Sequence, residues 1–319
     1  MGTQLRLRSA KVLIINLGSV GMEIVKNLVL GGINSIDIVD DSVIKEEDYA
    51  AQFFLPNDDK FIGELKLPNI IEPIKELNNR VNINIHTDNF NQLLADKDFF
   101  KKFDLIIGTE LVKQEIIELN ELTRTFNIPL YVTGLHGIFG YIITDLIQHV
   151  STVERNTINQ AKTIGEELSL NKVVENYQVD KPNNKEILTI KDTYSPISSI
   201  FTSDNLPKQL SKRQLRKLSS SLPIILSLLE SDRSELTTEE INLKAIQMCS
   251  NLGISPDILS KEYLQEFTNQ QFTEFVPTSA ILGGCLAQDV IQFLSKRESP
   301  INNTLILDGL RSEMPIYSL

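Results

Sequence analysis

The chain has 319 residues, of which 41% are hydrophobic and 23% are charged, as in an ordinary globular protein. Its 31 basic and 42 acidic residues give a net charge of -11, which argues against a nucleic-acid-binding protein. No apolar run reaches the roughly 20 residues of a membrane helix, and two cysteines are too few for a disulfide framework, which favours a reducing compartment. A chain of this length is expected to form a large α/β unit with an appended subdomain, or two domains.

The first elements form a strand, a glycine loop, a helix and a second strand. Residues 11–17 are a continuous apolar run, typical of a strand buried on both faces. The glycine loop at 18–21 follows, and residues 22–30 have the apolar spacing of a helix. Residues 36–40 predict the second strand, which a right-handed crossover would place parallel to the first.

This alternation continues along the chain. Residues 81–85 and 104–108 predict two further strands, 112–126 a helix, and 129–132 a fifth strand. Strands that alternate with helices predict a doubly wound, mostly parallel, Rossmann-like sheet. We therefore expect a Rossmann-like core over residues 1–150.

The composition turns polar between residues 151 and 196. We interpret this stretch as an insertion with a mobile part rather than a second core, with an exposed loop at 181–185. Helices are expected to resume at Ser211. Residues 151–270 are thus predicted to form a polar insertion and a helical subdomain, and residues 271–319 a C-terminal helix and strands that complete the core.

The C-terminal region has a long predicted helix over residues 277–294, followed by strands at 304–308 and around 315–317. Gly283 and Gly284 lie inside this helix, where each costs about 1 kcal/mol relative to alanine. A partner that approaches the helix backbone closely would offset this cost. That partner is either the chain's own sheet or another subunit.

The loop at 18–21 has a degraded dinucleotide-binding pattern. In the G-x-G-x-x-G frame the first glycine is replaced by Asn16, while Gly18 and Gly21 are kept. Asp40 ends the second strand, in the position of an acid that accepts ribose hydroxyls. Nucleotide binding and simple turn packing explain the pattern equally well.

Histidine and cysteine residues predict no catalytic or metal site. His86, His136 and His149 are scattered and lack the spacing of metal ligands. His136 does follow the fifth strand, where α/β proteins place ligands, but a structural role is favoured. Cys249 and Cys285 lie in apolar helical patterns, where a small buried thiol is the usual outcome.

Several segments resemble a known family. They are residues 7–13 with the glycine loop, 21–28, 46–48 with 51–54, 103–105, 127–131, 302–303 with 308–309, and the most specific segment, FVPTSAILGGCLAQDV at 275–290. The chain resembles the adenylation domains of ubiquitin-like-protein-activating enzymes and their bacterial relatives ThiF and MoeB. Within that family it is most similar to the smaller, non-cysteine subunits of heterodimeric SUMO-activating enzymes. Only the polar stretch before residue 196 is poorly covered.

The resemblance implies a catalytically inert copy of the fold. Active members adenylate the C-terminal carboxylate of a ubiquitin-like protein with ATP and magnesium. Ala51 stands where they carry an arginine, Glu64 where they carry a lysine, and Glu110 lies in the segment where they carry an Asp-Asn pair. The resemblance therefore assigns no catalytic or metal residue, and it leaves Gly18, Gly21 and Asp40 as vestigial nucleotide-site candidates.

The resemblance also implies a partner. A heterodimer would form with a larger subunit that carries the ATP and magnesium site and the thioester cysteine, and SUMO would be bound through the complex. A nuclear location follows, with the cytoplasm as a second compartment. Neither nucleic acid nor membrane is an expected partner.

The N-terminus departs from the family pattern. Family members begin with a segment whose first arginine reaches the partner's ATP site, and Met1–Leu7 lack most of it. Either the N-terminus is shortened or Arg6 or Arg8 acts instead. We expect shortening and assign no trans-acting arginine.

Three other hypotheses remain. The chain could be the equivalent subunit for the Nedd-type modifier, although those subunits are markedly longer. It could be an autonomous sulfur-carrier adenylating enzyme, which needs the missing charges. From a different class, it could be a nicotinamide-dependent oxidoreductase that uses the unit from Gly18 to Asp40.

Overall fold

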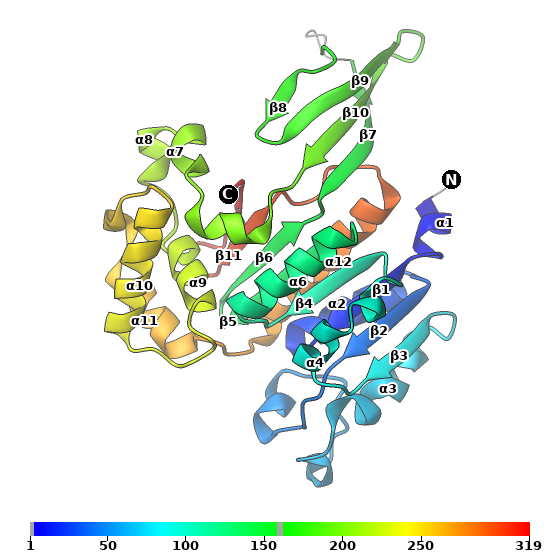
Figure 1. Ribbon diagram of the computed structural model, residues 1–319, viewed down its shortest axis with the longest axis vertical. Helices are drawn as coiled ribbons and strands as arrows, with labels where there is room; N and C mark the ends of the chain where they lie inside the picture. Colours follow the sequence, from blue (N-terminus) through cyan, green and yellow to red (C-terminus); the bar gives the residue numbers. More distant parts are fainter. Residues whose placement is uncertain (1–2, 158–161) are drawn as a thin grey trace.

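The computed structural model describes residues 3–157 and 162–319. An eight-stranded sheet runs through the molecule, with helices on both faces and a second, smaller sheet projecting from one end (Figure 1). In spatial order the main sheet consists of β12 (Ile316–Tyr317), β11 (Thr304–Asp308), β6 (Phe139–Asp145), β5 (Leu130–His136), β4 (Leu105–Thr109), β1 (Lys11–Ile15), β2 (Ser35–Val39) and β3 (Asn82–His86).

The strand order confirms the predicted α/β fold. Strands β3, β2, β1, β4 and β5 are neighbours in that order and all parallel. Strands β6, β11 and β12 extend the sheet in antiparallel fashion beyond β5. The chain leaves β1 toward β2 on one side and later returns to β4 on the other. The carboxyl ends of β1 and β4 therefore form a topological switch point, where open α/β sheets bind ligands.

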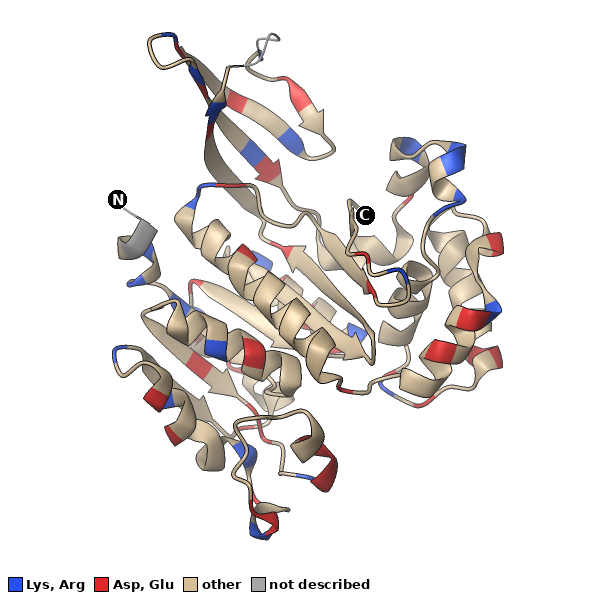
Figure 2. Ribbon diagram, turned by 180° about the vertical axis from the view of Figure 1, so that it is seen from behind, with Lys and Arg blue, Asp and Glu red and all other residues tan. Residues whose placement is uncertain are grey.

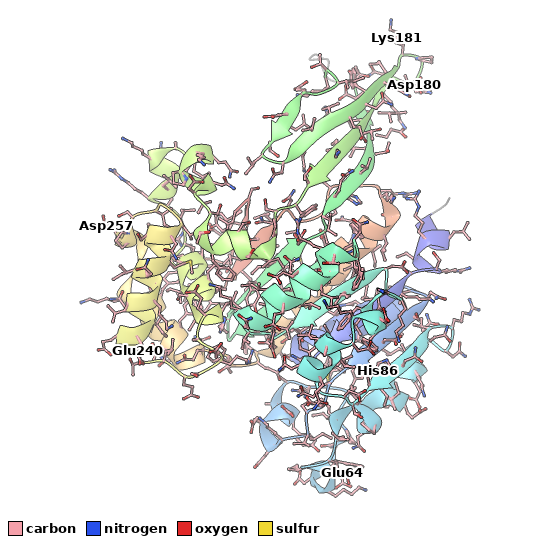
Figure 3. The ribbon with its side chains drawn as sticks, in the orientation of Figure 1. Glu64, His86, Asp180, Lys181, Glu240 and Asp257 are labelled. Carbon is pink, nitrogen blue, oxygen red and sulfur yellow. The ribbon has the colours of Figure 1, made fainter. Side chains whose placement is uncertain are left out.

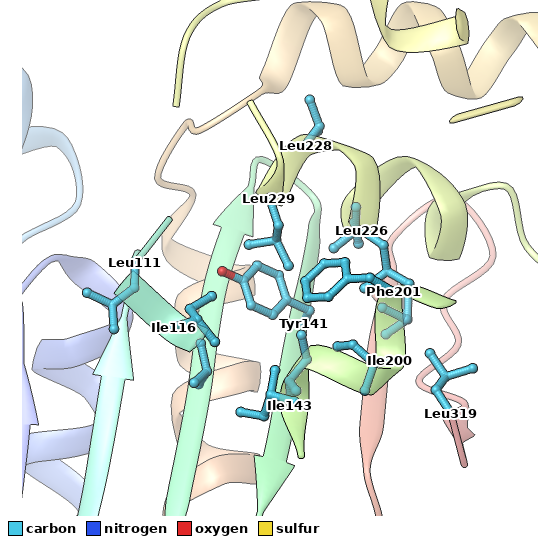
Figure 4. Close-up of a cluster of buried hydrophobic side chains, with 14 of the residues drawn as sticks. Leu111, Ile116, Tyr141, Ile143, Ile200, Phe201, Leu226, Leu228, Leu229 and Leu319 are labelled. Carbon is cyan, nitrogen blue, oxygen red and sulfur yellow. The ribbon is translucent and has the colours of Figure 1, made fainter. Parts of the chain in front are cut away.

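Two apolar clusters lie on opposite faces of the sheet. One includes the helices α2 (Ser19–Leu30), α3 (Lys66–Leu77) and α12 (Val276–Ser295), which face the viewer in Figure 2. Figure 4 shows part of the other, where Tyr141 and Ile143 of β6 pack against Phe201 and Leu229. The helices on that second face are α4 (Phe90–Ala95), α5 (Lys97–Phe100), α6 (Lys113–Thr125), α9 (Ser221–Leu229), α10 (Thr238–Asn251) and α11 (Lys261–Gln270).

Short elements fill the connections. They are α1 (Thr3–Leu7), η1 (Glu46–Ala50), η2 (Asp59–Phe61), η3 (Ile197–Thr202), α7 (Asn205–Gln209), α8 (Lys212–Leu215) and η4 (Pro256–Ile258). Helical structure thus resumes at Ile197 rather than at the predicted Ser211, because Ile197, Ile200 and Phe201 bury their side chains in the core. Within the described residues, none of the helices has both the length and the apolar character needed to cross a bilayer.

The polar stretch after residue 151 is an insertion, as expected, but it forms a regular sheet that the sequence pattern did not predict. Four antiparallel strands lie in the order β7 (Gln148–Asn156), β10 (Lys185–Thr193), β9 (Lys172–Asp180) and β8 (Glu167–Ser169), while residues 158–161 are outside the described part. The exposed loop expected at 181–185 is the turn between β9 and β10, with Asp180 and Lys181 at its tip (Figure 3).

The residue pattern of β10 explains why this sheet was not predicted. Its residues alternate strictly between buried and less buried positions, which is the period of a half-buried strand. The buried set contains Leu188 and Ile190 but also Glu186 and Asp192. Because two of the four buried positions are charged, the sequence does not show the alternation of apolar and polar residues that predicts a strand. Leu188 and Ile190 pack with Val174 of β9 into a small apolar cluster that is separate from the main core.

The adjacent glycines of α12 have different surroundings. A Cβ atom on Gly283 would lie 2.4 Å from Glu23 Cβ of α2, so this glycine lets two helices approach closely. A Cβ atom on Gly284 would meet no atom within 4 Å. Packing within the chain therefore explains Gly283, through α2 rather than the sheet, and leaves Gly284 unexplained.

A buried carboxyl group joins α12 to the sheet. Asp289 accepts hydrogen bonds from Tyr131 Oη of β5 (2.8 Å) and from the backbone N of Ile301 (3.0 Å). Only 6% of the residue is exposed, and this burial raises the pKa of Asp289 to about 6. The folded chain therefore holds a proton here at pH values where the unfolded chain has lost it.

This site predicts a pH dependence of stability. The folded state binds the extra proton between about pH 4 and pH 6, so its contribution to the free energy of unfolding falls as the pH rises through that window. For the rise of the Asp289 pKa from 3.8 to about 6, the loss in the free energy of unfolding across this window amounts to about 3 kcal/mol. Urea titrations of Asp289→Asn at pH 4 and pH 7 are expected to show that the variant gains stability relative to the wild type as the pH rises. A constant difference between the two proteins would contradict this assignment.

Candidate functional site

A cleft of about 840 Å³ lies at the carboxyl ends of β1, β2 and β4, at the switch point of the sheet. Gly18 and Asp40 of the sequence prediction both line it, together with Asn16, Ala51 and Gln52. Its ionisable lining is strongly acidic. Eight carboxylates and three basic side chains line the cleft: Asp40, Asp41, Glu47, Asp48, Glu110, Glu115, Glu235 and Glu274, and Lys45, Lys66 and Arg233.

The loop after β1 keeps the shape of a nucleotide-binding turn. Asn16 adopts a left-handed conformation (φ 64°), which glycine prefers and asparagine tolerates. Its side chain donates to the carbonyl of Thr109 (3.0 Å), and Thr109 Oγ1 donates back to the Asn16 carbonyl (2.9 Å). Asn16 therefore replaces the first glycine of the frame in conformation and also ties β1 to β4.

Gly21 has a packing role. A Cβ atom at this position would lie 3.0 Å from the Asn16 carbonyl oxygen, so the glycine allows α2 to approach the end of β1. Gly21 is buried and does not line the cleft. The three candidate residues thus separate into two that face the cleft and one that supports the loop beneath it.

Asp40 is engaged with the backbone. Its Oδ2 accepts a hydrogen bond from the Leu17 N–H (2.7 Å), and its Oδ1 accepts one from the Ser42 N–H (2.7 Å). The residue is 5% exposed. In this structure Asp40 therefore braces the glycine loop, and both of its oxygens already have donors.

Glu274 lies at the N-terminus of α2. Its Oε1 accepts a hydrogen bond from the Ser19 N–H at 2.6 Å, and a Cβ atom on Gly18 would come within 2.3 Å of the same oxygen. Its Oε2 accepts from Gln52 Nε2 at 3.0 Å. Helix N-termini attract anions through free N–H groups and the helix dipole, and nucleotide-binding loops use this property to hold phosphate. Here a carboxylate of the same chain takes that position.

The structure corrects the expectation about the lysine of this site. Glu64 does not line the cleft and lies at the lower edge of the molecule in Figure 3, where it accepts a hydrogen bond from Asn69. Lys66, the first residue of α3, is 5% exposed and lines the cleft, with its Nζ 3.5 Å from the Leu17 carbonyl oxygen. A cation is therefore present, two residues beyond the predicted position.

Each basic side chain of the cleft already has an acidic partner. Lys66 Nζ lies 3.8 Å from Asp48, and Lys45 Nζ lies 3.6 Å from Glu47. Both acids belong to η1, which is mostly red in Figure 2. Arg233 is paired with Glu110, as described next. Each cation of the described lining thus has a carboxylate within 4 Å that competes with a phosphate group for it.

Glu110 directly follows β4, in the segment for which the resemblance implies an Asp-Asn pair in active members. Its Oε2 accepts from Arg233 Nη1 (2.5 Å) and its Oε1 from the Leu135 N–H (2.9 Å). Burial raises the pKa of Glu110, and the neighbouring Arg233 opposes that effect. Both carboxylate oxygens are thus engaged inside the protein.

The remaining candidates do not add a reactive group. Cys249 is buried, and burial raises its pKa to about 11; Cys285 is half-buried, and burial raises its pKa as well. Both thiols are therefore poor nucleophiles at neutral pH. His136 is buried and accepts a hydrogen bond from the Phe272 N–H. Arg6 donates to the Ser295 carbonyl at the end of α12 of the same chain.

Magnesium and ATP do not fit this lining. A triphosphate would meet an excess of carboxylates, paired cations, and Glu274 at the α2 N-terminus. Within the described residues, no group of three His, Cys, Asp or Glu side chains is arranged to hold a metal ion. We therefore derive no chemical step in this cleft.

Three of these residues were missed in the sequence. Glu274 is 255 positions from Ser19, and Arg233 is 123 positions from Glu110, so no local pattern connects the members of either pair. Lys66 carried a weak signal, because it is a lone basic residue at the start of an amphipathic helix that closely follows Gly63.

The contact between Gly18 and Glu274 can be tested by a double-mutant cycle. Gly18→Ala is expected to push the Glu274 carboxylate away from the α2 N-terminus and to lower the free energy of unfolding by about 1–2 kcal/mol, the scale of a charge-assisted hydrogen bond near a helix dipole. In a Glu274→Ala background the same change is expected to cost much less. Equal costs in both backgrounds, measured by urea unfolding, would show that the two residues are not coupled.

Comparisons with known proteins cover nearly the whole chain. The model of the ThiF family matches residues 1–319. The DNA damage tolerance protein RHC31 of Saccharomyces cerevisiae is 37% identical, with 99% of this chain and 92% of the relative aligned. The SUMO-activating enzyme subunit 1 of Homo sapiens is 26% identical, with 97% and 88% aligned.

Solved structures share the fold at low identity. The crystal structure of E. coli MccB with succinimide has a TM-score of 0.55 and 13% sequence identity. The match covers 99% of this chain and 65% of that chain. At this identity the likeness concerns the fold alone.

Proposed function

The chain belongs to the ThiF family, and from this premise we propose that it is the non-catalytic, smaller subunit of a heterodimeric activating enzyme for a SUMO-type modifier. It is homologous to SUMO-activating enzyme subunit 1 over nearly its full length. In the proposed complex a larger, homologous subunit binds ATP and magnesium and carries the thioester cysteine. A nuclear location is part of the same proposal.

One observation carries the proposal that the subunit is inert. The position that would receive a phosphate group is taken by Glu274, and the cleft has no unpaired cation among its described lining residues. Adenylation enzymes act mainly by placing substrates and stabilising charge, so the loss of several charged contacts removes most of the rate enhancement. The raised pKa values of Cys249 and Cys285 support the placement of the thioester in the partner.

The similarity also ranks the other hypotheses. The named relatives favour a SUMO-type modifier over a Nedd-type one. An autonomous adenylating enzyme needs free cations, which this cleft does not offer. The family match over residues 1–319 and the named relatives favour the activating-enzyme hypotheses over a nicotinamide-dependent oxidoreductase.

A partner surface is available beside the C-terminal helix. Exposed apolar side chains gather at the start of α12 and in the C-terminal segment: Phe275, Val276, Ile281, Leu310, Met314 and Ile316. Several of them border a hollow of about 340 Å³ between the two segments. Gly284 lies three residues from Ile281 on this helix, and packing within the chain does not require a glycine at this position. We propose that this surface contacts the larger subunit.

Activity measurements test the inert role. The isolated chain is expected to catalyse no ATP–pyrophosphate exchange above background, because the cleft repels the triphosphate. Restoring one cation with Ala51→Arg, alone or with Glu274→Gln, is expected to leave exchange at background while circular dichroism confirms that the variants are folded. Robust exchange by the unmodified chain would overturn the proposed function.

Partner binding tests the surface. Co-expression with the larger subunit is expected to give a one-to-one complex by native mass measurement. Ile281→Asp, which places a charge in the apolar surface, is expected to weaken that complex at least about tenfold, because a buried unpaired charge costs several kcal/mol. Leu243→Asp is the matched control, because Leu243 is 67% exposed on α10 and is not part of the apolar surface beside α12. Equal effects of the two changes would argue against this interface.

A further inference from the structure

The segment that contains α7 and α8 is basic, in contrast to the rest of this acidic chain. Residues 205–229 include five Lys and Arg side chains and no Asp or Glu. One of the five, Lys208, is paired with Asp204. The other four are exposed and have no acidic side chain within 4 Å among the described residues: Lys212, Arg213, Arg216 and Lys217.

The fold brings a fifth unpaired cation to this place from a distant segment. Arg311, between β11 and β12, donates a hydrogen bond from Nη1 to the carbonyl of Lys217 (2.9 Å), although the two residues are 94 positions apart. Its guanidinium lies 6.0 Å from the centre of the Tyr263 ring. Arg311 is exposed and, in the described part of the chain, also has no carboxylate within 4 Å. We call these five residues, 212, 213, 216, 217 and 311, the α8 basic surface; its α8 part is blue at the upper right of Figure 2.

The backbone that carries this surface is held in place. Ser211 and Gln214 form a capping box at the start of α8, in which Ser211 Oγ accepts from the Gln214 N–H and Gln214 Oε1 accepts from the Ser211 N–H. Leu215 and Leu218 pack against the main apolar core. A set of charges on an ordered backbone binds a partner at a lower entropic cost than charges on a mobile loop.

The charge of the surface is opposite to that of its surroundings. Without the five cations, 26 basic residues would remain against 42 acidic ones, a net charge of -16. Scattered surface charges need no partner, but cations gathered from two segments produce a local positive potential. Such a potential attracts a negatively charged group to this place on the molecule.

We infer that the α8 basic surface binds a short acidic segment of another polypeptide. Arg213 and Arg216 are three positions apart and therefore lie on one face of the α8 turn. Guanidinium groups bind carboxylates through two parallel hydrogen bonds, so two arginines suit neighbouring Asp or Glu side chains. Residues 212–217 extend over about 9 Å at the rise of a helix, which about three residues of an extended peptide cover.

Nucleic acid fits this surface less well. A nucleic-acid strand carries a charge about every 3.4 Å and continues beyond a surface of this size. It would then meet acidic residues of the neighbouring elements, such as Asp257, which is labelled in Figure 3. The loop that leads to Asp257 lies next to α7, since a Cβ atom on Gly253 would be 3.2 Å from Pro207. A short peptide can remain on the cations alone.

The test uses the full chain and short peptide probes, observed by backbone NMR. The probe is acetyl-Gly-Glu-Glu-Glu-Glu-Gly-amide, and its control has glutamine in place of each glutamate. The glutamate peptide is expected to shift the signals of Arg213, Arg216 and Lys217, with an affinity that falls as added salt screens the charges. The glutamine peptide is expected to leave them in place. The absence of shifts, or identical shifts with both peptides, would overturn the inference.

Variants locate the binding. Arg216→Gln removes one guanidinium and is expected to weaken the glutamate peptide at least about threefold. Arg80→Gln is the matched control, because Arg80 is exposed between α3 and β3, has no acidic side chain within 4 Å among the described residues, and lies outside the α8 basic surface. Circular dichroism checks that both variants are folded. Equal weakening by the two changes would show non-specific attraction and overturn the site.

An oligonucleotide tests the class of the partner. A single strand of about 15 thymidines is expected to bind more weakly than the glutamate peptide at the same salt concentration, because its flanking phosphates extend over acidic surface. Tighter binding of the oligonucleotide would overturn the assignment to an acidic polypeptide. None of the five cations lines the cleft, so these outcomes leave the proposed function unaffected.

Discussion

The contact between Glu274 and the first turn of α2 is the constraint on which the cleft depends. It joins the segment that enters α12 to the glycine loop, and through Gln52 it also fixes the loop that follows β2. A carboxylate at a helix N-terminus is favourable by itself, since it satisfies a free N–H group and opposes the helix dipole. The chain thus obtains from its own residue the stabilisation that related folds obtain from a bound anion.

The framework beneath the cleft has the geometry of a nucleotide-binding turn, whereas the charges that line the cleft do not suit a triphosphate. Asn16 keeps the left-handed conformation of the lost glycine, Gly21 keeps the close approach of α2, and Asp40 keeps the loop in place. These features concern backbone shape, on which the whole sheet depends. The charges of the cleft are a separate matter: the resemblance implies an arginine in active members where this chain has Ala51, and the carboxylate of Glu274 lies at the α2 N-terminus. The backbone geometry of the loop therefore does not depend on a set of cations suited to a triphosphate.

Most of the fold was predictable from the sequence because buried parallel strands are continuous apolar runs. The strand at residues 11–17 and the helix that ends in the glycine pair could be placed within a few residues. The β7–β10 sheet could not, because Glu186 and Asp192 occupy inward positions where a pattern search expects apolar side chains. They tolerate burial through ion pairs with Arg155 and Lys172, which are visible only once the strands are aligned.

The candidate site was only partly predictable, for a related reason. Gly18 and Asp40 belong to one local unit and could be recognised together. Glu274 and Arg233 reach the cleft from loops far along the chain, and the ion pair between Arg233 and Glu110 depends on the tertiary fold. A local sequence pattern is enough to predict the glycine turn. The net charge of the cleft depends on side chains from distant segments, which only the folded structure brings together.

The projecting sheet is attached to the body in a way that permits evolutionary change. Its first and last residues, Gln148 and Thr193, are directly paired, so the chain departs and returns at the same place. Material between two such adjacent points can lengthen, shorten or be exchanged while the connection to the body keeps its geometry. Natural selection could therefore reshape this appendage for new contacts independently of the nucleotide-fold scaffold that supports it.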